Sequence, residues 1–163
     1  MRTANDRSWK MARWRSAGVN VAVWLVLGSS AWADDWPRFL GPQANSISSE
    51  TGINKDWNAD PPEECWRVSM SDEGFSGPAI KGQVIYLHDH EGEDDVIRAL
   101  DVNDGNELWR FSYPEPGREN HGFTRATPTI EAGRAYTVSR TGVVHCLKAE
   151  NGEMVWRADV MAN

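Results

Sequence analysis

The chain has 163 residues, with 17 basic and 24 acidic side chains and a net charge of −7 at pH 7. This length is enough for one modest domain. An excess of negative charge repels phosphate backbones, so the composition argues against nucleic acid as a partner.

Residues 1–33 have the organisation of a secretory signal peptide. A positively charged start precedes the apolar run Val21–Leu27, and the A-W-A sequence at 31–33 is a small-residue cleavage site. The apolar run is too short to span a bilayer as a helix. We therefore expect an exported protein, periplasmic or extracellular, whose mature chain begins at Asp34.

The mature chain is more acidic than the whole. Removing residues 1–33 takes away five basic residues and one acidic residue, which leaves 12 basic and 23 acidic residues and a net charge of −11. No second long apolar segment follows, and no cysteine directly follows the cleavage site. We expect neither a membrane span nor a lipid anchor in the mature chain. Met1 and Met11 both remain open as the start of the chain.

An internal repeat is the most informative feature of the sequence. Segments 78–110 and 128–157 align with each other, and the turn residues Gly105 and Gly152 lie 47 residues apart. The tryptophan four residues after each glycine keeps the same spacing. A third, partial copy surrounds Trp66. Self-similarity at such a period indicates an array of like structural units.

Each unit is predicted to contain four short strands. They are expected at 79–80, 84–87, 96–100 and 108–111 in the first unit, and at 129–130, 135–138, 143–147 and 155–158 in the second. Four strands in a repeat of about 40 to 50 residues are typical of propeller blades. The predicted fold is therefore all-β, a partial β-propeller with about two four-stranded antiparallel blades. A sandwich with chance spacing is the alternative.

The predicted organisation places an N-terminal extension at 34–63, an outer strand at 64–70, and blades at 76–113 and 126–160. Trp109 and Trp156 occupy the same position on the last strand of each blade. An indole there can fill the gap between neighbouring sheets and donate its N–H to a backbone carbonyl. We expect both tryptophans to be mostly buried, at equivalent places.

The repeat residues also carry a family resemblance. The first unit contains Ala99, Asp101, Gly105 and Trp109, and the second keeps Gly152 and Trp156. They resemble the blade signature A-x-D-x-x-T-G-x-x-x-W of the pyrrolo-quinoline quinone (PQQ)-like repeat family. This family includes quinoprotein alcohol dehydrogenases and the outer-membrane assembly factor BamB. The segment 36–42 is similar to the W-P-x-F-R-G-P opening of exported PQQ-like propellers, with Leu40 in place of arginine.

The resemblance implies a ring of about eight blades. At roughly 45 residues a blade, such a ring needs about 360 residues. We therefore expect a fragment of a longer propeller. Uncovered blade faces would make it marginally stable or aggregation-prone when expressed alone.

His88-Asp89-His90-Glu91 is the densest cluster of potential metal ligands. Imidazole and carboxylate groups at close spacing can bind a divalent metal. In a strand, however, His88 and His90 share one face while Asp89 points to the other. The cluster also runs into an acidic hairpin tip, so we expect a solvated turn there. We expect no metal site, with His88 and His90 as weak candidates.

His121 and Arg125 lie in the long connection between the two units. In a propeller this connection passes over one face toward the central channel, where the resemblance implies that ligands bind. Both residues are candidates for contacts with an anionic ligand, and a structural loop with surface charge is the alternative.

Cofactor chemistry depends on the resemblance alone. Quinoproteins of this type use carboxylate and amide ligands around calcium, a stacking tryptophan and, in many cases, adjacent cysteines. Here Cys65 and Cys146 are far apart in sequence, and a disulfide between them remains open. We expect no cofactor for this chain alone, and PQQ with calcium only if it belongs to a dehydrogenase.

The sequence shows no nucleophile–base motif and no phosphate-binding glycine loop. It therefore favours an exported, non-enzymatic binding or scaffold module, with a protein or carbohydrate ligand. The alternative is an N-terminal piece of a PQQ-dependent dehydrogenase.

Overall fold

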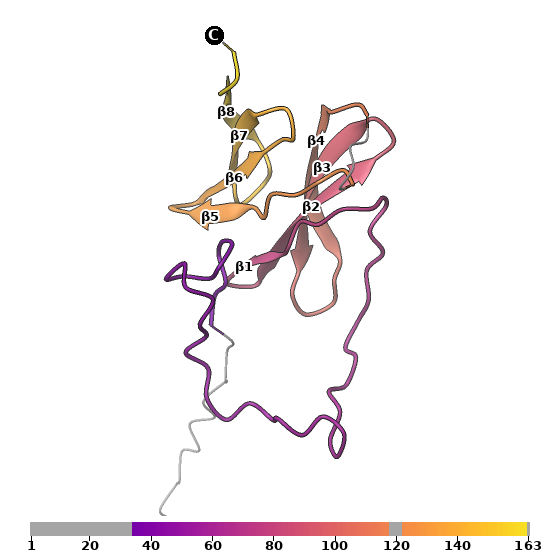
Figure 1. Cartoon of the computed structure of the whole chain (residues 1–163), viewed down its shortest axis with the longest axis vertical. Helices are drawn as coiled ribbons and strands as arrows, with labels where there is room; N and C mark the ends of the chain where they lie inside the picture. The colour runs from indigo at the N-terminus through magenta and orange to yellow at the C-terminus, as the bar shows by residue number, and fades with distance from the viewer. Residues whose placement is uncertain (1–33, 118–121, 163) are drawn as a thin grey trace, which may run out of the picture. The chain divides into compact units, whose positions relative to one another are not determined.

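The computed structural model describes residues 34–117 and 122–162, which form two four-stranded antiparallel sheets (Figure 1). The first sheet contains β1 (Ala79–Lys81), β2 (Val84–Glu91), β3 (Asp94–Asp101) and β4 (Glu107–Pro114). The second contains β5 (Thr129–Glu131), β6 (Arg134–Val138), β7 (Val143–Lys148) and β8 (Met154–Asp159). The strands of each sheet lie in chain order. The predicted all-β fold, a partial propeller with two blades, is confirmed.

The two sheets are structural equivalents down to their irregularities. The register between the third and fourth strands shifts between Ala99 and Leu100 in one sheet and between Cys146 and Leu147 in the other. These positions are 47 residues apart, as the repeat predicts. A bulge of this kind increases the local twist of a sheet. The sheets therefore share their curvature as well as their strand order.

The hairpin between β2 and β3 is longer than the sequence predicted. Residues 91–95 lie between the predicted strands 84–87 and 96–100, but Glu91 pairs with Asp94 and His90 with Asp95. Only two residues remain for the turn. The strands extend further because the polar side chains near the hairpin tip bond to one another.

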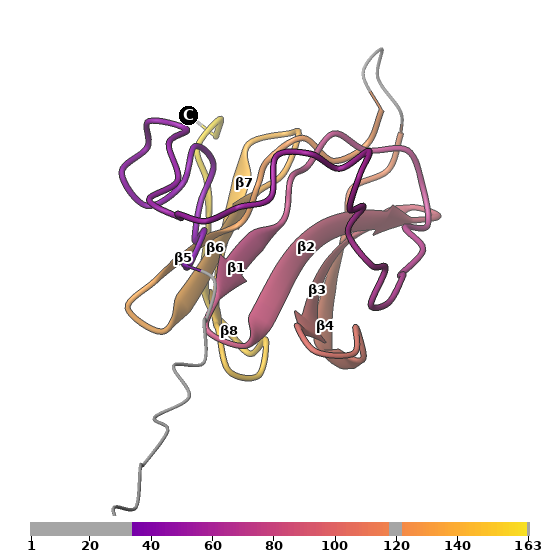
Figure 2. The same ribbon diagram turned by 90° about the horizontal axis from the view of Figure 1, so that it is seen from below.

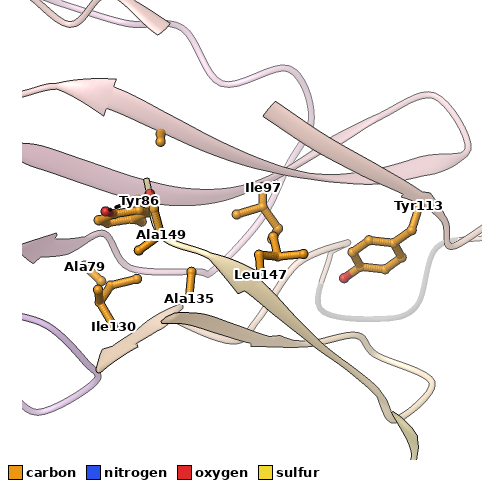
Figure 3. Packing of buried hydrophobic residues seen from close by; sticks show 9 residues of the cluster. Ala79, Tyr86, Ile97, Tyr113, Ile130, Ala135, Leu147 and Ala149 are labelled. Carbon is orange, nitrogen blue, oxygen red and sulfur yellow. Dashed lines mark hydrogen bonds between the residues drawn. The ribbon is translucent and has the colours of Figure 1, made fainter. Parts of the chain in front are cut away.

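The apolar core lies between the two sheets (Figure 3). The first sheet contributes Ala79, Tyr86, Ile97, Ala99 and Tyr113, and the second contributes Ile130, Ala135 and Leu147, with Ala149 from the turn that follows β7. Alternate residues of each strand point to opposite faces, so one face of each sheet supplies this cluster. The cluster holds the two blades together face to face.

Trp109 joins the blades through a close contact with a glycine of the next blade. Its Nε1–H donates to the carbonyl of Ala149 at 3.0 Å. A Cβ atom added to Gly152 would lie only 2.5 Å from the Trp109 ring, and Gly152 has a φ of +74°. Glycine is therefore required there both by the left-handed backbone and by the indole. Trp109 is half-buried, so the prediction of a mostly buried indole is only approximately met.

Trp66 makes the same contact with the first blade. Its Nε1–H donates to Val102 O at 2.9 Å, and a Cβ on Gly105 would lie 2.7 Å from its ring. In both cases the accepting carbonyl belongs to the residue three positions before the glycine. The outer strand predicted at 64–70 is absent, because no strand within 34–117 and 122–162 pairs with this segment. The tryptophan docks nonetheless.

Trp156 departs from the prediction of a mostly buried residue. It is 45% exposed, although it lies on β8 where Trp109 lies on β4. Trp156 packs against Tyr136 within its own sheet, with ring centroids 6.2 Å apart. Among the described residues, no glycine turn covers it as Gly152 covers Trp109. Burial at this position depends on the neighbouring blade.

The segment at 35–38 lies beside the first strands of both sheets (Figure 2). Trp36 forms a two-way bridge with Ile80 of β1, and Ile130 of β5 donates its N–H to Pro37 O at 2.7 Å. Asp35 pairs with Lys81 at 2.6 Å. This part of the predicted N-terminal extension therefore ties the inner strands of the two blades together.

Several sequence predictions concern residues at the ends of the chain or its cysteines. The predicted signal peptide, 1–33, lies outside the described residues. None of the residues 34–117 and 122–162 belongs to a helix long and apolar enough to cross a membrane. Cys65 is exposed, Cys146 is buried, and both are free, so the disulfide left open by the sequence is not formed.

Candidate functional site

The histidine cluster of β2 lies inside the protein. Strand alternation directs His88 and His90 toward the second sheet, while Asp89 faces the other side and pairs with Arg98 at 3.2 Å. Each of the three residues of the cluster is 1% exposed. The expectation of a solvated turn is wrong, because β2 and β3 extend to the hairpin tip and the second blade covers their inner face.

Asp95 is the centre of this buried cluster. His90 Nδ1 lies 2.8 Å from one carboxylate oxygen, and His88 Nε2 lies 3.2 Å from the other. The Tyr113 hydroxyl donates to the same oxygen as His88 at 3.1 Å. Three polar side chains, two from β2 and one from β4, therefore share the one carboxylate of Asp95 on β3.

The hydrogen bonds also fix the orientation of His90 and lower the pKa of Asp95. His90 Nε2 faces Gly92 O at 2.9 Å while its Nδ1 faces Asp95, so both ring nitrogens meet acceptors. The imidazole of His90 is therefore held between Asp95 and the backbone of the hairpin turn. Burial alone would raise the pKa of Asp95, but the bonds from His88, His90 and Tyr113, with the charge of His88, hold it below its ordinary value.

His88 and His90, the weak metal candidates, form hydrogen bonds with Asp95 in the structure. Within 34–117 and 122–162, no group of three His, Cys, Asp or Glu residues is arranged to hold a metal ion. His90 and His88 instead direct nitrogens at Asp95, and Tyr113 directs its hydroxyl there. This arrangement surrounds the buried carboxylate of Asp95 with hydrogen-bond partners.

His88 carries the cluster across to the second blade. Its Nδ1 lies 3.3 Å from both Ala126 O and the Thr137 hydroxyl of β6. Thr124 Oγ1 donates to the carbonyl of His88 at 2.9 Å. The polar cluster and the apolar core therefore join the same two faces.

A cavity of about 320 Å³ opens beside His88, between the blades. It is lined by His88, Thr124, Arg125, Ala126, Val138, Ser139 and Arg140. Arg125 comes from the connection between the blades, and Arg140 from the turn between β6 and β7. The structure thus places the predicted candidate Arg125 at a cavity, whereas His121 lies outside the described residues.

The two arginines of this cavity differ in exposure and in their protein partners. Arg125 is exposed. Arg140 is held by Pro116 O at 3.1 Å and by the Glu115 carboxylate at 3.6 Å. Arg125 is therefore the cation that is free to meet an incoming group. A guanidinium suits carboxylate or phosphate ligands.

A larger cavity, of about 410 Å³, lies at the other end of the interface beside the docked Trp109. Its wall includes Tyr86, Leu108, Arg134 and Lys148. Tyr86 donates there to Ala149 O at 3.2 Å, and burial raises its pKa. The docked Trp109 and its acceptor residue Ala149 both line this cavity. We therefore regard the 320 Å³ cavity, with its convergent polar groups, as the candidate site.

Sequence reasoning missed four polar residues at this interface: Asp95, Tyr113, Ser139 and Arg140. Asp95 lies outside the predicted strands 84–87 and 96–100, although extending the alternation of β2 through a two-residue turn would have paired it with His90. Tyr113 lies two residues beyond the predicted end of its strand. No sequence signal joins Arg140 to Arg125, because only packing of one blade on the next brings them together.

These features define a class of protein. Two successive four-stranded blades, each contacted by a tryptophan at a glycine turn, make the chain a PQQ-like β-propeller repeat protein. A family model described as outer membrane protein assembly factor BamB matches residues 48–119 and 93–163. The matches extend over more than half of the chain, so the chain belongs to this family.

Individual relatives are more distant. The outer membrane protein assembly factor BamB of Salmonella typhimurium is 26% identical over 110 residues, which covers 61% of this chain and 26% of that protein. The chain thus spans about a quarter of the length of this relative.

Two solved structures resemble the chain over a larger part of it. The quinohemoprotein alcohol dehydrogenase of Comamonas testosteroni has a TM-score of 0.61 and 19% identity, covering 79% of this chain and 20% of that one. A europium-containing methanol dehydrogenase has the same TM-score and identity, covering 77% and 23%. At such identity the likeness shows the fold alone.

Proposed function

We propose that the chain is an exported, non-enzymatic binding or scaffold module of PQQ-like propeller type. The observation that carries this proposal is the use of its buried titratable groups. His88, His90, Asp95 and Tyr113 bond to one another and hold the blades in place. Groups committed in this way support a rigid platform rather than proton transfer to a substrate.

The binding surface of this proposal is the 320 Å³ cavity with Arg125 at its mouth. A protein ligand is supported by the family, because its relatives are named for the assembly of outer membrane proteins. Such a ligand would present a carboxylate to Arg125, whose guanidinium offers paired N–H donors. Export is supported by the sequence of residues 1–33.

Photo-crosslinking in the producing cell tests this proposal. A photoreactive amino acid at position 125 is expected to give a discrete adduct with one exported protein, identified by mass spectrometry. Position 134 serves as the control, because it begins β6, whereas the cavity lies at Val138, where β6 ends. The same amino acid at position 134 should not give this adduct. Retention of the chain in the cytoplasm, or identical adducts from both positions, would contradict the proposal.

A part of a PQQ-dependent dehydrogenase is the second candidate function, and the cavity favours it in one respect. Arg125 and Arg140 suit the carboxylates of the quinone. The residues do not fit calcium, because the polar groups lining the cavity are arginines, a histidine and hydroxyls, with no carboxylate among them. Cys65 and Cys146 are both free and are far apart in the sequence. The residues described here therefore fit only one part of that ligand set.

Quinone binding distinguishes the two candidates. The chain is titrated with PQQ in the presence and absence of calcium, and tryptophan fluorescence is followed. The scaffold proposal expects no saturable change and no alcohol-dependent dye reduction. Calcium-dependent, saturable quenching that Arg125→Gln abolishes would favour the dehydrogenase.

A further inference from the structure

A third cavity, smaller than the two described above, also lies in the interface between the blades. It has a volume of about 100 Å³ and is lined by Tyr113, Pro114 and Glu115 from the first blade and by Thr141, Val143, His145 and Arg157 from the second. A water molecule takes about 30 Å³ in the liquid, so the cavity suits about three waters or a ligand of a few heavy atoms. A quinone or a peptide is too large for it.

His145 and Arg157 are neighbours on one wall of this cavity. They are directly opposite each other in the β7–β8 ladder, so their side chains lie on the same face. His145 is 3% exposed, and its ring stacks on Tyr113 with centroids 4.1 Å apart. Figure 3 shows Tyr113 at one end of the apolar cluster. The imidazole is thus held in a fixed orientation by the first blade.

One ring nitrogen of His145 lacks a partner. Its Nδ1 is buried and makes no hydrogen bond with any residue in 34–117 or 122–162. A buried polar atom without a partner costs about 1–3 kcal/mol. Such an atom at the wall of a polar cavity indicates a small molecule that completes its hydrogen bonds.

The charges around the cavity leave one cation unbalanced. Glu115 accepts from the N–H of Thr141 at 3.2 Å and from its hydroxyl at 2.9 Å, and Arg140 lies 3.6 Å away. Glu115 is therefore balanced by Arg140. Arg157 has no ion pair or hydrogen bond within the described parts of the chain, and it is exposed. Its guanidinium can meet a ligand that enters from solvent.

We propose that this cavity binds a small anion, a carboxylate or an inorganic oxyanion of the size of acetate or phosphate, between Arg157 and His145. The guanidinium supplies charge and two N–H donors to one edge of the anion. A protonated His145 supplies a further donor. The site is independent of the 320 Å³ cavity and of the function proposed above.

Anion binding is coupled to proton uptake by His145. Burial lowers the pKa of His145 below its ordinary value of 6.5, and the charges of Arg157 and His88 lower it further, while Glu115 and Asp95 act in the opposite direction. The other groups that face the ring are uncharged: Phe111 and Tyr113 of β4, and Thr137, its neighbour on β6. An anion beside Arg157 removes the largest charge effect, so His145 gains a proton when the anion binds. Affinity therefore increases as pH falls toward and below 6.5.

The histidine resonances of the chain give a direct test. The sequence has only four histidines, so the ring signals are assigned by single His→Gln variants. Sodium acetate and sodium phosphate are each titrated at constant ionic strength, with chloride as the balancing ion. We expect a saturable shift of the His145 signal, and a rise of its titration midpoint by about one pH unit, a tenfold gain in proton affinity. The anion with the lower saturation midpoint identifies the preferred chemistry.

Variants of Arg157 decide the outcome. Arg157→Gln should abolish the saturable shift, Arg157→Lys should keep part of it, and Arg134→Gln should leave it unchanged. If the glutamine variant does not fold, the lysine variant and the comparison of acetate with chloride still test the site. An equal response to chloride, or an unchanged response in Arg157→Gln, would overturn the proposal.

Discussion

Two separate constraints, one from the backbone and one from the next blade's contact, require glycine at position 152. Its φ of +74° requires a conformation that side chains with a Cβ rarely adopt, and the Trp109 indole occupies the place of that Cβ. Gly133 has almost the same φ, +73°, but no atom lies within 4 Å of its virtual Cβ. The two glycines therefore separate the backbone effect from the contact between blades.

We predict that Gly152→Ala destabilises the chain more than Gly133→Ala. Both substitutions should cost about 1–2 kcal/mol for the left-handed backbone. Gly152→Ala should cost about 1–3 kcal/mol more, because the new methyl group overpacks against Trp109. Urea unfolding of the two variants measures the difference. Equal losses would mean that the indole moves away at no cost.

Asp95 should make stability depend on pH in the acid range. Its pKa in the folded chain lies below the ordinary 3.8, so the unfolded chain binds more protons in acid. The stabilisation is fully present above this value and is lost as pH falls through the lower pKa of the folded state. We predict that Asp95→Asn costs about 3 kcal/mol at pH 7, because it removes the carboxylate that bonds to His88, His90 and Tyr113 in the interior.

The measurement for Asp95 is a series of unfolding curves from pH 7 to pH 2. The difference between the original chain and Asp95→Asn should shrink below pH 4. Asp94→Asn serves as the control, because Asp94 is the preceding residue and faces the other side of β3. A difference that stays constant with pH would contradict the charged state assigned to Asp95.

At the scale of single elements, β4 and β8 provide a matched pair. Both are outer strands with a tryptophan at the same position, but only Trp109 has a glycine turn of a following blade against it. We predict that Trp109→Ala costs about 3 kcal/mol, near the lower end for a large aromatic residue. Trp156→Ala should cost less than about 1 kcal/mol, because its indole is 45% exposed.

Denaturant unfolding compares the two variants, and acrylamide quenching reports which indole is accessible. Quenching of the original chain should fall markedly after Trp156→Ala and little after Trp109→Ala. Similar losses of stability in both variants would indicate that the two outer strands have the same surroundings.

At the scale of the whole described unit, the two sheets should unfold together. The apolar cluster and the His88–Thr137 contact join them face to face. We predict that Ile97→Ala, at a residue 1% exposed, costs about 2–5 kcal/mol and lowers protection from hydrogen exchange in both sheets equally. Leu108→Ala, at a residue 52% exposed, should have little effect. Loss of protection in the first sheet alone would show that the blades are independent.

The repeat was predictable from the sequence because its signals are local or periodic. The sequence itself contains the turn glycines, the tryptophan four residues later and the 47-residue spacing. These signals indicate strand number, strand order and blade boundaries. Strand ends were less certain, since β2 and β3 extend into a segment that looks like an acidic loop. The polar residues there remain in strands because His90 and Asp95 form a hydrogen bond with each other.

The sequence by itself determined the class of fold and the position of the docking tryptophans. Only the tertiary structure decided which of them is covered, that the histidines surround Asp95, and that Arg125 shares a cavity with Arg140. The physical reason is the range of the interactions. Backbone conformation and strand alternation depend on near neighbours in the chain, whereas burial, the partners of His88 and the walls of a cavity depend on the face that the next blade presents.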